Sequence, residues 1–150
     1  MDNAKSQKAK ELFMKGYNCS QSVLGAWCEE LGLDLDTALK ISSGFGGGMG
    51  RMREVCGALT GAFMVLGLKY GNTNGKNRQA KGDNYKLIQD FTERYKEEIG
   101  RDTIICRELL GLDGASKPEP AERTKEYYKK RPCSEMVEIS AGLLDEFINP

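Results

Sequence analysis

The sequence predicts an all-α, single-domain protein of about six helices, spanning residues 1–150. No segment alternates apolar and polar residues over a convincing length, apolar residues recur at i, i+3 and i+4, and glycines stand at the ends of these segments. We expect the helices to pack around a buried central helix that is rich in glycine and alanine, at about residues 51–69. A chain of 150 residues is long enough to bury such a core without covalent cross-links.

Three helices are expected before the centre. Gly16 and Gly32 are typical of residues that follow a helix end, and Asn18 is typical of an N-cap. Asp34 or Asp36 is expected to cap the third helix. These helices are predicted at residues 4–15, at 19 to about 31, and at 37 to about 42.

The central helix follows a glycine-rich loop, residues 44–50. The segment 55–68 has no charged residue, and it is too short for a membrane span, which needs roughly 20 apolar residues. A buried helix is therefore the better interpretation. Gly57 and Gly61 have no side chain and so allow a neighbouring backbone to approach closely. Each glycine in a helix costs about 1 kcal/mol of helix propensity, and we expect close packing to offset this cost.

The second half of the chain contains a polar loop and further amphipathic helices. Pro132 is expected at the start of the last helix. The charged segment 123–131 is expected to be a solvated helix with Tyr127 and Tyr128 packed beneath it. The loop is predicted at 70–82, with helices at 85–99, from Asp102 or Thr103 to about 110, and from 133 to about 147, and a linker at 114–120.

Composition excludes several kinds of chemistry. Basic and acidic residues number 22 each, so net charge gives no argument for nucleic acid. There is no histidine, which excludes Ser-His and Cys-His nucleophiles, Cys/His zinc fingers and a CxxCH haem site. The polar start and the lack of a signal-like segment predict a cytoplasmic protein without membrane insertion. Five cysteines remain as the candidates for chemistry.

Three of the cysteines fall at predicted helix starts. Cys19, Cys106 and Cys133 lie where free amide groups and the helix dipole stabilise a thiolate. Cys56 lies slightly inside the central helix, close to Arg51. Arg101, Arg107 and Arg131 add positive charge near the other thiols.

Cys28 differs, because it lies beside Trp27 on an apolar helix face, and we interpret it as a small buried core residue. The other four cysteines are separated by long spacings, which leave open whether they share one site.

The glycine-rich loop supports a second hypothesis. Successive glycine amides before a helix, with Arg51 and Arg53 beside them, are able to cradle an anion. The glycines fit no Walker or dinucleotide motif, and a tight backbone passage is the simpler interpretation. The candidate cofactor-binding residues are Gly46, Gly47, Gly48 and Gly57. The alternative function is thus a non-enzymatic helical module that binds an anion or small ligand through residues 44–50.

Several motifs in this order carry a family resemblance: Asn18-Cys19-Ser20-Gln21, the run GGGMG, Cys56-Gly57-Ala58-Leu59-Thr60-Gly61, and isolated Cys106 and Cys133. The chain resembles the C-GCAxxG-C-C family of putative redox-active proteins from about residue 16 to residue 133. Here Val55, rather than glycine, precedes Cys56. The resemblance implies a small helical protein marked by four cysteines, which match Cys19, Cys56, Cys106 and Cys133, and Cys28 has no counterpart.

The sequence therefore predicts a redox-active protein in which these four cysteines form the catalytic or metal-binding site. The open alternatives are an iron–sulfur cluster, a thiol–disulfide couple and, less favoured, zinc; no haem is expected. In a disulfide couple Cys133 or Cys19 would attack and Cys56 would be the buried partner. An unidentified electron donor or acceptor protein is the expected partner. A homodimer through the small-residue face of the central helix is compatible with the sequence, and no nucleic acid is expected.

Overall fold

The computed structural model describes residues 3–150, and this part of the chain is helical with no strand, which confirms the all-α prediction. Six of its helices have eight or more residues, in agreement with the predicted number. They are α1 (Ala4–Met14), α2 (Cys19–Trp27), α3 (Leu35–Ser42), α5 (Gly57–Tyr70), α6 (Arg78–Ile99) and α9 (Cys133–Ile148). Shorter helices are α4 (Gly46–Met49), α7 (Cys106–Leu110) and α8 (Lys125–Lys130), with 3-10 turns at Glu29–Leu31 and Ser43–Phe45.

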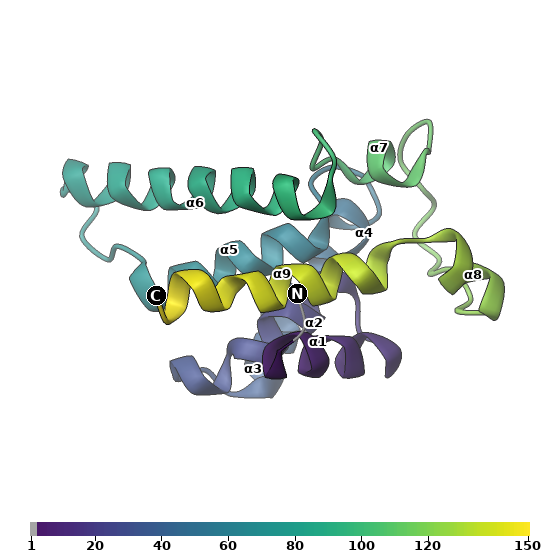
Figure 1. The fold of residues 1–150 in the computed structure, drawn as a ribbon, viewed down its shortest axis with the longest axis horizontal. Coiled ribbons are helices and arrows are strands. Elements are labelled where there is room, and N and C mark those ends of the chain that lie inside the picture. Colours follow the sequence, from purple (N-terminus) through teal and green to yellow (C-terminus); the bar gives the residue numbers. More distant parts are fainter. Residues whose placement is uncertain (1–2) are drawn as a thin grey trace.

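The core lies where α2, α5 and α9 meet. In Figure 1, α6 runs along one side of the molecule, α1, α2 and α3 lie on the other, and α5 and α9 lie between them. Trp27 is fully buried, and its indole N–H donates to the carbonyl oxygen of Ala141 at 2.9 Å. Ser140 Oγ donates to the carbonyl oxygen of Ala58 at 2.7 Å. These buried hydrogen bonds fix α9 against both neighbours.

Close packing of α2 on α5 depends on glycine, as the sequence predicts. A Cβ atom at Gly61 would lie 2.7 Å from the carbonyl oxygen of Ser20, which is closer than any real side chain approaches. A Cβ at Gly57 would lie 3.1 Å from Cys19 Cβ. The small-residue face of α5 is therefore occupied by α2 of the same chain.

The predicted start of the central helix is wrong. Helix α5 begins at Gly57, six residues after the expected start at about 51, and Cys56 is its N-cap. Arg51 and Arg53 both have a φ of 62°, which does not continue a right-handed helix. The backbone of this turn bonds instead to α4 and α7: the N–H of Arg53 donates to Gly47 at 3.2 Å, and the N–H of Cys106 donates to Glu54 at 2.6 Å.

Helix α6 also differs from the prediction, because it begins at Arg78 rather than at Tyr85. Asn77 caps it through a hydrogen bond from the N–H of Ala80 to its Oδ1 at 3.0 Å. The first two turns of α6 are exposed and polar, so they lack the i, i+3, i+4 pattern of apolar residues from which a helix is predicted. Among residues 3–150, no helix has both the length and the apolar character needed to cross a membrane.

Candidate functional site

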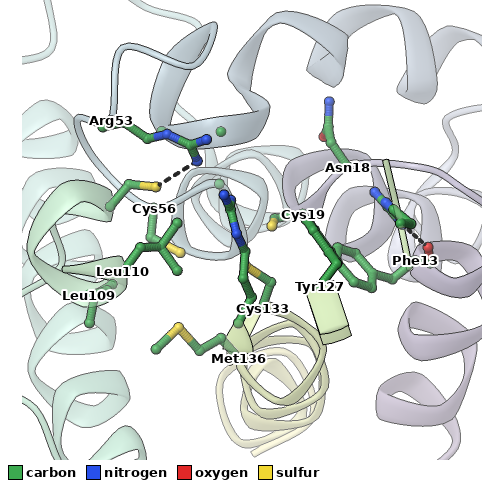
Figure 2. Close-up of a pocket in the computed structure, with 16 residues that line it drawn as sticks. Phe13, Asn18, Cys19, Arg53, Cys56, Leu109, Leu110, Tyr127, Cys133 and Met136 are labelled. Carbon is green, nitrogen blue, oxygen red and sulfur yellow. Dashed lines mark hydrogen bonds between the residues drawn. The ribbon is translucent and has the colours of Figure 1, made fainter. Parts of the chain in front are cut away.

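Four cysteines from four separate helices line one pocket. Cys19, Cys106 and Cys133 are the first residues of α2, α7 and α9, and Cys56 caps α5. Figure 2 shows Cys19, Cys56 and Cys133 around a common space, with Tyr127 and Met136 beside them, and Cys106 lines the same pocket. The sequence places three of these cysteines at helix starts, and the structure places the fourth, Cys56, at one as well. Their chemical role stays a prediction.

Two glycines allow the backbone to approach these thiols. Gly48 has a φ of 69°, and a Cβ there would lie 2.5 Å from Cys106 Cβ. Gly57 packs directly against Cys19. Of the four predicted cofactor-binding glycines, Gly47, Gly48 and Gly57 line the cysteine pocket, whereas Gly46 lines a neighbouring cavity, where it packs against Asn18.

Cys19 and Cys133 line the same pocket and shift each other's pKa in opposite directions. The pKa of Cys133 is lowered to about 7, first by hydrogen bonding with the Cys19 thiol and then by Arg131, Arg53 and Arg123, against the opposing effect of burial. The same hydrogen bond raises the pKa of Cys19, with burial acting in the same direction. Cys133 is therefore the thiol of this pair that loses its proton first, and Cys19 is the thiol that keeps its proton.

Cys56 is buried at the start of α5. Burial raises its pKa to about 12, although amides at the start of α5 act in the opposite direction. The expected effect of a helix start on thiolate stability is therefore outweighed here by desolvation. Tyr95 is fully buried and close enough to interact with the Cys56 thiol, and its pKa is raised mainly by burial. Its hydroxyl makes no hydrogen bond of good geometry.

Arg53 ties the fourth cysteine into the site. Its Nη1 donates to Cys106 Sγ at 3.5 Å, and its Nε donates to Ser116 Oγ at 2.9 Å. Only 3% of Arg53 is exposed. Arg53 therefore holds the Cys106 side chain and the Ser116 side chain in place at the same time.

Sequence reasoning assigned some charges correctly and missed others. Arg131 acts on the thiols as expected, but Arg107 pairs with Glu54 at 3.0 Å and Arg101 donates to the carbonyl oxygen of Glu108. The roles of Arg123 and Tyr95 were missed. Arg123 belongs to an exposed charged segment and Tyr95 to the apolar face of α6, and neither pattern distinguishes a site residue from an ordinary one.

The four thiols match the donors of an iron–sulfur cluster in type and number. In the part of the chain that the structure describes, no group of three or more Cys, Asp or Glu side chains is arranged so that it could hold a metal ion. Binding of a single metal ion would therefore require the four cysteine side chains to move closer to one another.

Comparison with known proteins identifies the family of this chain. The fold and the site define a small helical protein with a convergent set of free cysteines. Residues 17–147 match the model of a family described as "Putative redox-active protein (C_GCAxxG_C_C)", and the chain belongs to this family. It is also similar to a protein of Archaeoglobus fulgidus described as uncharacterized, with 29% identity over 118 residues, covering 77% of this chain and 73% of that protein. No solved structure matches the chain.

Proposed function

We propose that this redox-active protein works through a thiol–disulfide couple formed by Cys133 and Cys19. The observation that carries the proposal is that these two cysteines, the first residues of α2 and α9, line one pocket and lie close enough to shift each other's pKa. Both side chains are partly exposed, whereas Cys56 and Cys106 are buried. A substrate disulfide therefore meets Cys133 or Cys19 before the deeper thiols.

The pKa values of the two thiols indicate which one attacks the substrate and which one resolves the mixed disulfide. The Cys133 thiolate attacks one sulfur of a substrate disulfide, a mixed disulfide forms, and one substrate thiolate leaves. Cys19 then attacks Cys133 Sγ and gives its proton to the second departing sulfur. Two cysteine thiols are oxidised and one substrate disulfide is reduced to two thiols. An external electron donor, for which we propose a protein, restores the pair.

An iron–sulfur cluster is the second candidate, and a different observation favours it. Cys19, Cys56, Cys106 and Cys133 surround one space, and the unpaired Tyr95 hydroxyl lies beside Cys56 as a donor for a bound sulfur. A cluster held by these thiols would supply one-electron transfer. The role of the protein would be to hold the four thiolates, to exclude water through Met136 and Tyr127, and to stabilise negative charge through Arg53.

One set of variants separates the two candidates. The protein is purified without oxygen, and iron, acid-labile sulfide and visible absorbance are measured together with disulfide formation in the single serine variants. The thiol–disulfide couple predicts that Cys133→Ser and Cys19→Ser abolish the disulfide, whereas Cys56→Ser and Cys106→Ser retain it. A cluster predicts iron and sulfide that are lost in all four variants. Cys28→Ser is the matched control, and a disulfide between any other two cysteines would refute the proposed pair.

A further inference from the structure

A second cavity adjoins the cysteine pocket, and four arginines line it. Its volume is about 320 Å³, within the usual range for small-molecule sites. Glycines of α4 and the segment of residues 118–121 form other parts of its wall, and no carboxylate side chain lines it. The arginines are Arg51, Arg53, Arg123 and Arg131, and we call this space the arginine chamber.

The positive charge of the chamber is not neutralised by the chain. None of the four arginines forms an ion pair within residues 3–150. Nη1 of Arg51 is buried and has no hydrogen-bond partner. Burial and the charges of Arg53 and Arg131 lower the pKa of Arg51, and Glu119 is the acid that acts weakly against them. Arg53 is buried and the other three are half-buried, and clustered guanidinium groups that are partly removed from water are stabilised when an anion pairs with them.

Specific contacts hold the arginines of the chamber in place. Arg123 donates to the carbonyl oxygens of Phe13 and Tyr17 and stacks on the Phe13 ring, with its Cζ 4.2 Å from the ring centroid. Arg131 lies over the ring of Tyr127 at 5.1 Å. Arg51 and Arg53 both adopt the left-handed backbone conformation, which is unfavourable for residues with a side chain. Strain of this kind is concentrated at functional sites, where the surrounding structure maintains it.

The chamber and the cysteine pocket share one wall. Arg53, Arg123 and Arg131 line both spaces, together with Asn18, Gly47 and Tyr127. All three of these arginines also act on the charge of Cys133. An anion in the chamber is therefore adjacent to the thiol pair, and a ligand long enough to extend through the shared wall reaches Cys133.

We propose that the arginine chamber binds the carboxylate end of a small acidic disulfide and so directs its sulfur atoms to Cys133. Guanidinium groups recognise carboxylates through paired, charge-assisted hydrogen bonds. This assignment rests on the proposed thiol–disulfide function and adds its substrate class. The atoms and electrons balance as above: the acidic disulfide becomes two acidic thiols, and Cys133 and Cys19 become a disulfide.

The substrate class is tested with two disulfides of opposite charge, dithiodiglycolate and cystamine. The rate at which each oxidises Cys133 and Cys19 is divided by its rate with free cysteine thiolate, which removes differences in intrinsic reactivity. We expect a normalised preference for dithiodiglycolate that falls ~10-fold in Arg51→Gln and Arg131→Gln, since each variant removes a charge-assisted hydrogen bond. Arg78→Gln, at an exposed position on α6, is the matched control and keeps the preference. Equal normalised rates for the two disulfides overturn the substrate class.

A second measurement tests the chamber without the thiol chemistry. Binding of inorganic phosphate to the Cys133→Ser protein is followed by calorimetry, with and without Arg51→Gln. Binding that is weakened ~10-fold by Arg51→Gln and unchanged by Arg78→Gln supports the chamber even if neither disulfide reacts, in which case the thiol–disulfide function alone fails. No binding of phosphate, or equal binding to both arginine variants, overturns the chamber. Thermal melting of each variant shows that it is folded.

Discussion

The two ends of helix α2 carry the same chemical group in opposite surroundings. Cys19 at the first residue is partly exposed and shares its pocket with three other thiols, whereas Cys28, just after the last residue, is fully buried. The thiol of Cys28 donates to the carbonyl oxygen of Gly25 in its own helix at 3.6 Å, and burial raises its pKa. The comparison teaches that the surroundings distinguish the two cysteines: other thiols act on Cys19, whereas the Cys28 thiol hydrogen-bonds to the backbone of its own helix.

The largest expected effect is the loss of the thiol couple. Cys133→Ser removes the attacking sulfur, so we expect disulfide formation with Cys19 to be abolished, measured by mass spectrometry after oxidation. Cys28→Ser should leave the reaction unchanged but lower the free energy of unfolding by about 1–2 kcal/mol, because it places a hydroxyl in an apolar site. If Cys28→Ser slows the reaction as much as Cys133→Ser does, the distinction between the two ends of α2 is wrong.

A substitution in α5 should disturb one end of α2 more than the other. Gly61→Ala introduces a methyl group 2.7 Å from the carbonyl oxygen of Ser20, and α2 must move away. We expect the free energy of unfolding to fall by about 1–3 kcal/mol, measured by urea denaturation. The rate of disulfide formation should fall as well, because Cys19 moves with Ser20.

Gly67→Ala provides the matched control on the same helix. A Cβ at Gly67 has no atom within 4 Å, so the substitution should raise stability by up to about 1 kcal/mol through helix propensity. Equal effects of Gly61→Ala and Gly67→Ala would show that the α2–α5 contact does not depend on close approach.

The third effect is a difference in pH dependence between the two cysteines. Because the pKa of Cys133 is lowered to about 7, its alkylation rate should rise ~10-fold between pH 6 and pH 8 as the thiolate fraction increases. The lowered pKa in the folded state also stabilises the fold above the ordinary thiol pKa, and this contribution is lost as pH falls through about 7. Cys28 should react only when the protein unfolds. Iodoacetamide labelling read by peptide mapping measures both, and a Cys133 midpoint near pH 9 would contradict the assignment.

The sequence predicts the framework of the site better than its electrostatics. Asn18 and Pro132 mark the helix starts that hold Cys19 and Cys133, because capping is a local property. The turn around Arg51 and Arg53 was predicted as helix, since its conformation depends on distant hydrogen bonds and not on a local pattern. The position of Arg123 depends on Phe13 and Tyr17, more than 100 residues away in the chain. Such long-range contacts leave no periodic signal in a single sequence.

The smallest effect tests whether local capping positions Cys19. Asn18 Oδ1 accepts the N–H of Gln21 at 3.0 Å, and the Gln21 side chain accepts the N–H of Asn18 in return. Asn18 Nδ2 also donates to the carbonyl oxygen of Ser43 at 3.0 Å. Asn18→Ala removes the two bonds of the Asn18 side chain and keeps the backbone N–H that bonds to Gln21, so we expect a loss of about 1 kcal/mol in the free energy of unfolding.

The same substitution should also disturb the reactive end of α2 selectively. Fraying of the first turn loosens the hydrogen bond between Cys19 and Cys133, and the pKa of Cys133 should rise, measured by the pH dependence of its alkylation. Asn77→Ala removes the cap of exposed α6 and is the matched control, with a comparable loss of stability and no change in this pKa. If Asn18→Ala and Asn77→Ala change the pKa of Cys133 equally, the change in pKa follows from the general loss of stability and not from the position of Cys19. If only Asn18→Ala changes this pKa, the N-cap of α2 is what holds Cys19 close enough to Cys133 to lower the pKa of Cys133.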